Sequence, residues 1–293
     1  MNGRHSGYSL MVGILVIVLL LACCPPEQRA VAAPVEHRDQ GEQQVAYMEV
    51  AELLSHRQQR RYSFLAEWPA DRLRRLQVWL ELGIVFRGDW SSEELATVLR
   101  VLDAYGARYG EARFCEITDA ALGLHFNTKG RHLAIARASG YRLPAGVWHN
   151  WAGEIVFKDG LFDDAFVEAN YYWSFLLGEY AEPDPELTFR DVVIGHEFGH
   201  VVIDGLRAEA TAAGYGEVSL EELYVRSIPK NQWPHGYACP NENLATELSV
   251  WALDVSRTAE VDSFRAEFLG TAVSNTGWPQ NPVFHSAAVD AGR

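Results

Sequence analysis

Five consecutive residues of this chain have the types and spacing needed to bind a metal ion and activate water: His196-Glu197-Phe198-Gly199-His200. Two histidines four positions apart project from one face of a helix, so they can share a single metal ion. The glutamate beside the first histidine can then take a proton from a water molecule on that metal. The pattern pairs an electrophile with a base, which is chemistry typical of a hydrolase.

The surroundings of this motif favour a metal site over two ordinary histidines. Apolar residues flank the pair on the expected helix, namely Val192, Val193, Phe198, Val201 and Val202. Two imidazoles and a carboxylate buried among such residues are costly without a partner. A bound metal removes that cost, so we expect His196 and His200 to be metal ligands and Glu197 to be the general base.

The third ligand distinguishes the possible classes of site, because catalytic zinc generally takes three protein ligands and one water. A metzincin needs glycine three places and histidine six places after the second histidine, where this chain has Ile203 and Leu206. The metzincin pattern is therefore excluded. The chain offers instead Glu242, at the start of an expected helix that runs to about Val255, which would complete a His-His-Glu site.

The motif and its downstream partners resemble the lethal-factor-type branch of the gluzincin metallopeptidases. In that branch an HEFGH helix precedes a Tyr-Ala pair and a Glu-Phe-Phe-Ala-Glu-like helix; here Tyr237-Ala238 and Glu242-Asn243-Leu244-Ala245 follow. The resemblance implies Zn²⁺ bound by His196, His200 and Glu242, with Glu197 as the general base. It also implies that Tyr237 donates its hydroxyl to the developing oxyanion. It covers only residues 196–247, and implies a zincin-like catalytic domain.

The proposed ligand helix departs from the family pattern in one position. The family's second glutamate, four residues after the ligand, is Thr246 here, and Glu247 follows it. Two alternatives remain open at this point. Either Thr246 supports a ligand by hydrogen bonding and Glu242 is the ligand, which we favour, or the register differs and Glu247 binds the metal.

Two further residues near the motif have competing interpretations. The interval between Tyr237 and Glu242 is shorter than in the family, which leaves His235 as an alternative oxyanion donor. Asp204 lies four residues after His200 and therefore on the same helix face, where it could orient a ligand. Its alternative role is simply to end the helix in solvent.

The amino terminus resembles a bacterial export signal. Arg4 precedes an unbroken apolar run from Leu10 to Ala22, which suits a secretory signal and is short for a transmembrane helix. The run ends in Leu20-Leu21-Ala22-Cys23, which resembles a lipobox and implies cleavage before Cys23 and acylation of its thiol. Leu21 is unusual at its position, so an uncleaved anchor remains an alternative. We expect an exported lipoprotein of the cell envelope, attached to the outer membrane or to the periplasmic side of a membrane.

Composition restricts the partners of the chain. The formal net charge is −14 at pH 7, so the surface repels phosphate backbones and nucleic acid is excluded as a partner. A peptide or protein substrate remains, with basic or neutral sequences favoured. Beyond Cys23 and Cys24 the only thiols are Cys115 and Cys239, which an oxidising periplasm would allow to pair. Two buried free thiols are the alternative.

The chain divides into four expected segments. Residues 1–22 form the signal peptide and 23–44, rich in Pro, Glu, Gln and Ala, a flexible tether. Residues 45–113 form a helical section, and residues 114–293 form the catalytic domain. In the helical section, apolar periodicity predicts helices over 45–54 and 71–86, and the Ser91/Glu94 capping box starts a third that reaches about Tyr105.

The catalytic domain is expected to mix strands and helices, which makes the whole chain α+β. Between Phe114 and Phe166, short apolar runs separated by Gly, Pro and Asn indicate strands, including 133–135 and 153–157. Thr188 and Asp191 predict the start of the motif helix, which should end near Gly205. A further helix is expected over 220–228.

Together these features predict a zinc metallopeptidase that hydrolyses peptide bonds. Zinc hydrolases of this kind commonly hold an extended peptide against an edge strand. The best candidate strand is 153–157, with Trp148, His149 and Trp151 just before it. We expect these three aromatic side chains to be buried core, and contact with substrate is their alternative role. The alternative is a catalytically inactive zinc-binding envelope lipoprotein that acts as a binding or scaffolding module. A structural envelope protein with an incidental motif is a second alternative.

Overall fold

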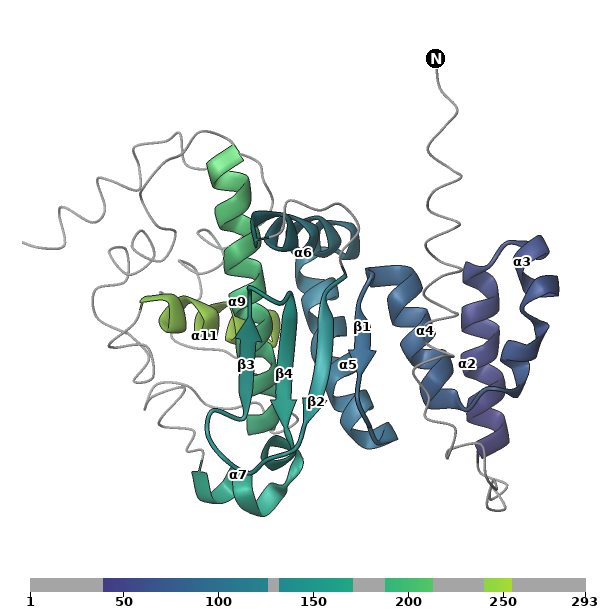
Figure 1. Cartoon of the computed structure of the whole chain (residues 1–293), viewed down its shortest axis with the longest axis horizontal. Helices are drawn as coiled ribbons and strands as arrows, with labels where there is room; N and C mark the ends of the chain where they lie inside the picture. Colours follow the sequence, from purple (N-terminus) through teal and green to yellow (C-terminus); the bar gives the residue numbers. More distant parts are fainter. Residues whose placement is uncertain (1–38, 126–131, 171–187, 213–239, 255–293) are drawn as a thin grey trace, which may run out of the picture.

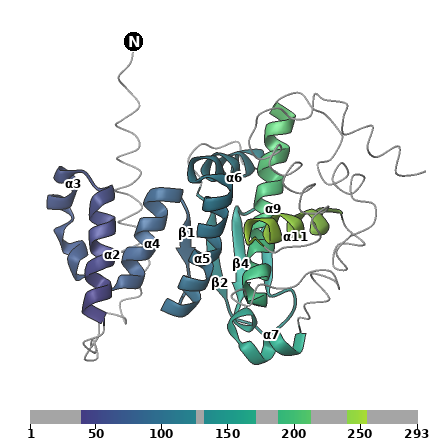
Figure 2. The same ribbon diagram turned by 180° about the vertical axis from the view of Figure 1, so that it is seen from behind.

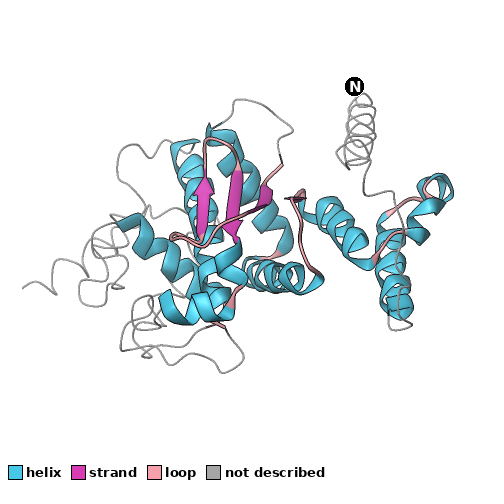
Figure 3. Cartoon of the chain, turned by 60° about the horizontal axis from the view of Figure 1, so that its bottom comes forward, coloured by secondary structure: helices cyan, strands magenta, loops and turns pink. Residues whose placement is uncertain are grey.

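The protein has a mixed α+β fold in which helices predominate and a small sheet lies against them (Figure 1; Figure 3). The computed structural model describes residues 39–125, 132–170, 188–212 and 240–254. The expected signal peptide, Cys23, the 220–228 helix, His235, Tyr237 and Cys239 lie outside these residues. The α+β class predicted from the sequence is confirmed.

The sheet has four strands in the order β1-β2-β4-β3. Strands β1 (Val85–Arg87), β2 (Ala134–Ala138) and β4 (Glu154–Lys158) are parallel, whereas β3 (Gly146–His149) runs antiparallel to β4. The strands expected near 133–135 and 153–157 are present. However, β4 pairs with a strand on each side, so the expectation that 153–157 forms the substrate-binding edge is wrong. The edge next to β4 is β3, because the chain forms a β3–β4 hairpin through the turn after His149.

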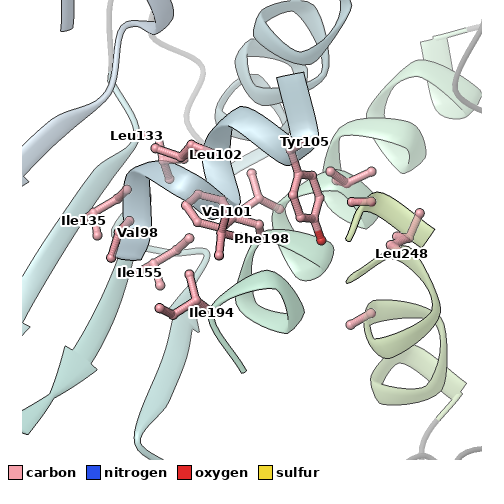
Figure 4. Packing of buried hydrophobic residues seen from close by; sticks show 14 of the residues in the cluster. Val98, Val101, Leu102, Tyr105, Leu133, Ile135, Ile155, Ile194, Phe198 and Leu248 are labelled. Carbon is pink, nitrogen blue, oxygen red and sulfur yellow. The ribbon is translucent and has the colours of Figure 1, made fainter. Parts of the chain in front are cut away.

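Four helices lie on one side of the sheet: α5 (Ser92–Tyr109), α6 (Glu111–His125), α9 (Phe189–Ala212) and α11 (Pro240–Ala252). Helices α6 and α11 pack against α9. Seen from behind, the four helices lie in front of the strands (Figure 2). Buried side chains of β2 and β4, such as Ile135 and Ile155, meet Val98 of α5 and Phe198 of α9 in one apolar core (Figure 4). Because α9 carries the HEFGH motif, this core fixes the motif against the sheet.

The first helices form a small core of their own beside β1. They are α2 (Asp39–Leu53), α3 (His56–Arg61), the 3-10 helix η2 (Ser63–Glu67) and α4 (Ala70–Leu82). The helix expected over 45–54 is present, but it begins at Asp39 and so includes the last residues of the expected tether. The helix expected over 71–86 ends at Leu82. Gly83 caps it in the left-handed conformation at φ 68°. The next residues form β1, so the expectation of an entirely helical section is wrong at this strand.

Helix α5 begins as its capping box predicts. The Ser91 hydroxyl accepts a hydrogen bond from the Glu94 amide at 3.2 Å, and the Glu94 carboxylate accepts one from the Ser91 amide at 3.0 Å. Helix α6 follows after Gly110, where strands and turns were expected from Phe114 onward. That expectation is wrong for the helical residues. Phe114, Ile117 and Ala121 recur at helical spacing and are buried, so the sequence did carry the signal.

Helix α9 starts as expected and ends later than expected. Both the Thr188 amide and its hydroxyl donate to the Asp191 carboxylate at 2.8 Å, and Arg100 of α5 binds the other oxygen of this fully buried carboxylate at 2.6 Å. The helix continues through Gly205 to Ala212. Gly205 does not end the helix, because it is the point where α9 touches α6. A Cβ atom there would lie 2.2 Å from the Ile117 carbonyl oxygen.

Two smaller elements, the 3-10 helix η3 (Asp159–Phe162) and helix α7 (Asp164–Asn170), follow β4. Arg190 near the start of α9 donates to the Leu161 carbonyl at 2.7 Å, which ties this segment to the motif helix. Among the residues that the structure describes, no helix is long and apolar enough to cross a membrane.

Replacing Gly205 with Ala should destabilise the fold by roughly 1–3 kcal/mol, because the new methyl group forces α9 away from the α6 backbone. The matched control is Gly123→Ala on α6, where a Cβ atom would meet nothing within 4 Å. That change should stabilise the protein by about 0.5–1 kcal/mol, since alanine favours a helix interior. Urea unfolding midpoints measure both effects, and an equal shift for the two variants would contradict the proposed contact.

Candidate metal centre

His196 and His200 lie on the same face of α9, one turn apart, as their spacing predicts. Their ring centroids are 4.7 Å apart and the rings are nearly perpendicular, with an angle of 87° between their planes. The two Nε2 atoms are 3.1 Å apart. The His196 side chain is 7% exposed and that of His200 is 11% exposed, so two imidazole nitrogens face each other with little access to water.

Glu242 of α11 completes the group. Its Oε2 atom lies 2.9 Å from Nε2 of His196 and 3.4 Å from Nε2 of His200. The three ligand atoms all lie within 4.8 Å of one another. Ligands 2.0–2.1 Å from a tetrahedral zinc ion are roughly 3.3 Å apart from each other. The donor set therefore fits zinc in both its chemistry and its spacing.

Two glycines allow α11 to approach α9 closely enough for this contact. A Cβ atom on Gly199 would lie 2.4 Å from the Ala245 carbonyl oxygen, and one on Gly195 would lie 2.4 Å from Oγ of Ser249. Ser249 in turn donates a hydrogen bond to the Val192 carbonyl at 3.1 Å. The glycine within the HEFGH motif thus has a direct structural reason, which is to let the helix that carries Glu242 reach the histidines.

Thr246 supports His196 from the side opposite to Glu242. Its Oγ1 atom lies 3.0 Å from Nδ1 of His196 and also donates to the Glu242 backbone carbonyl at 3.1 Å. Because the hydroxyl proton is directed at that carbonyl, the oxygen is left to accept the Nδ1 proton of His196. The Nε2 lone pair is then directed at the centre of the group, which is the tautomer that a metal ligand needs.

Glu247, the alternative ligand, is not part of the group formed by His196, His200 and Glu242. It is fully buried, as is Thr246, and it follows Thr246 on α11. The geometry therefore agrees with the register in which Glu242 meets the histidines and Thr246 takes the place of the second glutamate.

Glu197 lies between α9 and the edge strand. It is 7% exposed, and a Cβ atom on Gly146 of β3 would approach its Cγ atom to 2.8 Å. The absence of a side chain at Gly146 therefore makes room for the carboxylate. Glu197 also lines the same cleft as the two histidines and Glu242.

The carboxylates around His200 change the pKa of its imidazole. Burial lowers the pKa of this imidazole, but the hydrogen bond with Glu242 and the charges of Glu197, Glu242 and Asp204 more than offset that effect, so the pKa is raised. A raised pKa means that protons compete with a metal ion for this nitrogen at a higher pH than for an ordinary histidine. The same negative charges that favour the proton favour a metal cation.

Asp204 connects the motif helix to the edge strand. This 4%-exposed residue accepts a hydrogen bond from the Trp148 indole of β3 at 2.9 Å and one from Arg207 at 3.0 Å. The alternative that it merely ends α9 in solvent is wrong, since the helix continues to Ala212. Sequence spacing indicated its helix face and is compatible with the pair to Arg207 three residues later, but the contact with Trp148 comes from a distant strand that spacing does not reveal.

These residues line one cleft of about 660 Å³ between α9, α11, β3 and the segment before β3. Trp148 and Val147 contribute its strand wall, and Leu143 and Pro144 extend that wall beyond the start of β3. Arg207 and Asn150 also line it, and neither was singled out from the sequence. Trp151 is 72% exposed, so the interpretation of the three aromatics near β3 as buried core is wrong for this residue.

Some predictions involve residues outside the described part of the chain, so the structure does not test them. Tyr237 and His235 lie outside the described residues, so the choice of oxyanion donor stays a prediction. Cys115 lies on α6, where its thiol is 3.8 Å from the Glu81 carbonyl oxygen. Its expected partner, Cys239, is outside the described part, so their pairing also stays a prediction.

Comparison with known proteins does not assign the chain to a family. No protein-family model, curated protein or solved structure matches it.

The register of the third ligand can be tested with isosteric changes. Glu242→Gln should weaken zinc binding roughly 100-fold or more, because it removes a charged ligand atom from the group. Glu247→Gln is the matched control and should leave the affinity within a few-fold. Competition with a chromophoric chelator measures both. Loss of zinc binding in Glu247→Gln alone would show that the register is wrong.

Thr246→Val keeps the shape of the side chain but removes the hydroxyl that faces Nδ1 of His196. Zinc affinity should fall roughly 10- to 100-fold, since partners of ligating histidines contribute on that scale. Thr246→Ser restores the hydroxyl and should keep most of the affinity. If the valine and serine variants bind zinc equally well, the hydroxyl does not orient His196.

Proposed function

We propose that this protein is a zinc-dependent metallopeptidase with a zincin-like catalytic domain of the gluzincin type. The observation that carries the proposal is the convergence of His196, His200 and Glu242 in one cleft with Glu197. The resemblance of residues 196–247 to lethal-factor-type metallopeptidases supports it independently of the geometry.

Each residue of the site has a distinct task in this reaction. His196, His200 and Glu242 would hold zinc, which when bound lowers the pKa of water and polarises a carbonyl group. Glu197 accepts a proton from the attacking water at its carboxylate and delivers it to the amine nitrogen of the leaving group. Thr246 keeps the Nε2 lone pair of His196 directed at the metal position.

The geometry favours an extended peptide as substrate. Strand β3 is an edge of the sheet and lines the cleft next to Glu197, so its outer backbone groups can pair with a peptide strand. A peptide bound in this way carries its carbonyl groups past the metal centre. Peptide hydrolysis therefore accounts for a cleft that has the edge strand on one wall and the metal-binding residues on the other.

The cellular setting follows from the amino terminus. We propose that the protein is exported and attached to the cell envelope by a lipid on Cys23, so that its substrates are peptides or proteins outside the cytoplasm. Tyr237 remains the proposed hydroxyl donor to the oxyanion.

The decisive experiment is cleavage of a peptide library by the zinc-loaded full chain and by its Glu197→Gln variant. The variant should bind zinc normally but lose roughly 10²- to 10⁴-fold in kcat, because it cannot accept the proton. Glu154→Gln on β4, where the glutamate pairs with Arg87, is the matched control and should keep full activity.

Two outcomes would contradict the proposal. If purified wild-type protein binds no zinc, the metal site is wrong. If Glu197→Gln binds zinc and keeps its biological activity, the protein acts as a zinc-binding module and does not need to cleave peptides.

A further inference from the structure

Arg207 lies at one end of the cleft, on the same face of α9 as the residues of the metal centre. Successive intervals of four, four and three residues separate His196, His200, Asp204 and Arg207, so all four lie on one side of the helix. Arg207 is the only lysine or arginine among the described residues that line the cleft. The candidate site therefore contains one permanent positive charge that the proposed hydrolysis does not use.

Contacts that involve two other residues of the cleft wall fix the position of this arginine. Its Nη1 atom donates to Asp204 at 3.0 Å, and Asp204 is held from the strand side by the Trp148 indole. The Arg207 side chain remains 37% exposed, whereas that of Asp204 is 6% exposed. A guanidinium is a rigid fork with five N–H donors, so it can bind a buried carboxylate and a ligand carboxylate at the same time.

The charges around the cleft make such a contact selective. The other charged lining residues are Glu197, Asp204 and Glu242, and the whole chain carries a net charge of −14. An acidic group is therefore repelled at most positions along the cleft. Apart from the metal position, Arg207 is the one place among the described lining residues where a permanent positive charge attracts it, so the arginine would select where in a peptide an acidic group can lie.

The distance along α9 indicates which part of a substrate lies there. Arg207 follows His200 by seven residues, which is roughly 10 Å along the helix axis at 1.5 Å per residue. Helical side chains lean back toward the amino terminus, which shortens this distance to the metal centre. A peptide paired with β3, which runs alongside α9 (Figure 1), advances about 3.3 Å per residue, so the arginine would lie two or three residues from the scissile bond.

We propose that Arg207 is a specificity residue that binds a carboxylate of the substrate two or three residues from the scissile bond. The carboxylate belongs either to an acidic side chain or to the end of the peptide. This inference rests on the proposed peptidase function, and it refines the expectation of basic or neutral substrates by placing one acidic group at a defined position.

The test uses the zinc-loaded full chain and matched peptides in which glutamate or glutamine occupies each position on both sides of the scissile bond, with free or amidated carboxyl ends. In the wild-type protein, one glutamate should lower KM roughly 10- to 100-fold relative to glutamine, the range of a charge-assisted hydrogen bond. Arg207→Gln should abolish this preference and leave cleavage of the glutamine peptide nearly unchanged. If amidation alone removes the preference, the carboxylate is the peptide terminus.

Two further variants separate recognition from a structural role. Arg207→Lys keeps the charge and should keep part of the preference, and Arg87→Gln removes a charge from β1, at the opposite edge of the sheet from β3, and should change nothing. If Arg207→Gln lowers kcat for all peptides equally, or if glutamate and glutamine peptides never differ in the wild-type protein, Arg207 only neutralises Asp204 and the proposal is wrong.

The proposal can fail separately from the peptidase function. Calorimetry measures binding of the same peptides to the Glu197→Gln protein with and without Arg207→Gln. If no peptide is cleaved but binding still depends on glutamate and on Arg207, the peptidase function is wrong and the carboxylate site stands. If peptides are cleaved and neither cleavage nor binding depends on Arg207, the peptidase function stands and the proposed carboxylate site is wrong.

Discussion

The candidate site depends on the close packing of α11 against α9. At Gly195 and Gly199 the two helices approach so closely that an ordinary Cβ atom would collide with Ser249 or with the Ala245 backbone. This spacing brings Glu242 to within hydrogen-bonding distance of His196 and Thr246 to the other side of the same ring. A side chain at either glycine would separate the helices and remove the carboxylate from the histidines.

The same packing explains why a buried and polar interface is tolerated. His196, Glu197, Asp204, Thr246, Glu247 and Ser249 are all at least nine-tenths buried, and burial of unpaired polar groups is costly. Hydrogen bonds to neighbouring groups offset that cost, as when Ser249 donates to the Val192 carbonyl and Asp204 accepts from the Trp148 indole. Tyr105 adds to this support from α5, because its hydroxyl donates to the Gly195 carbonyl at 2.6 Å and burial keeps its pKa well above the ordinary value.

Local signals in the sequence predicted the structure better than distant contacts. The Ser91/Glu94 capping box and the Thr188/Asp191 start of α9 involve residues three apart, and both occur as expected. The edge strand was assigned wrongly because the position of a strand in a sheet depends on which segments pair. Gly205 was taken as a helix end because a glycine that ends a helix and one that touches a neighbouring backbone look alike in sequence.

The candidate site shows the same division between local and distant information. His196, Glu197 and His200 follow from spacing on one helix, and Glu242 from a resemblance over a short interval. The contact of Asp204 with Trp148 could not be inferred, since Trp148 is distant in sequence and on a strand that the pattern did not predict. Arg207 carried no motif at all, and only its place on the wall of the cleft distinguishes it from other surface arginines.

The small size of β3 limits how strongly a peptide could pair with it. The strand spans only Gly146–His149, with Pro144 shortly before it and a turn directly after it. Every second residue of a strand directs its backbone groups toward a neighbour, so such a short edge offers a peptide only a few main-chain hydrogen bonds. If the protein is the peptidase proposed above, a cut peptide is therefore held only weakly along this strand. The short edge also protects the protein itself, because it is a poor template for pairing with strands of other molecules.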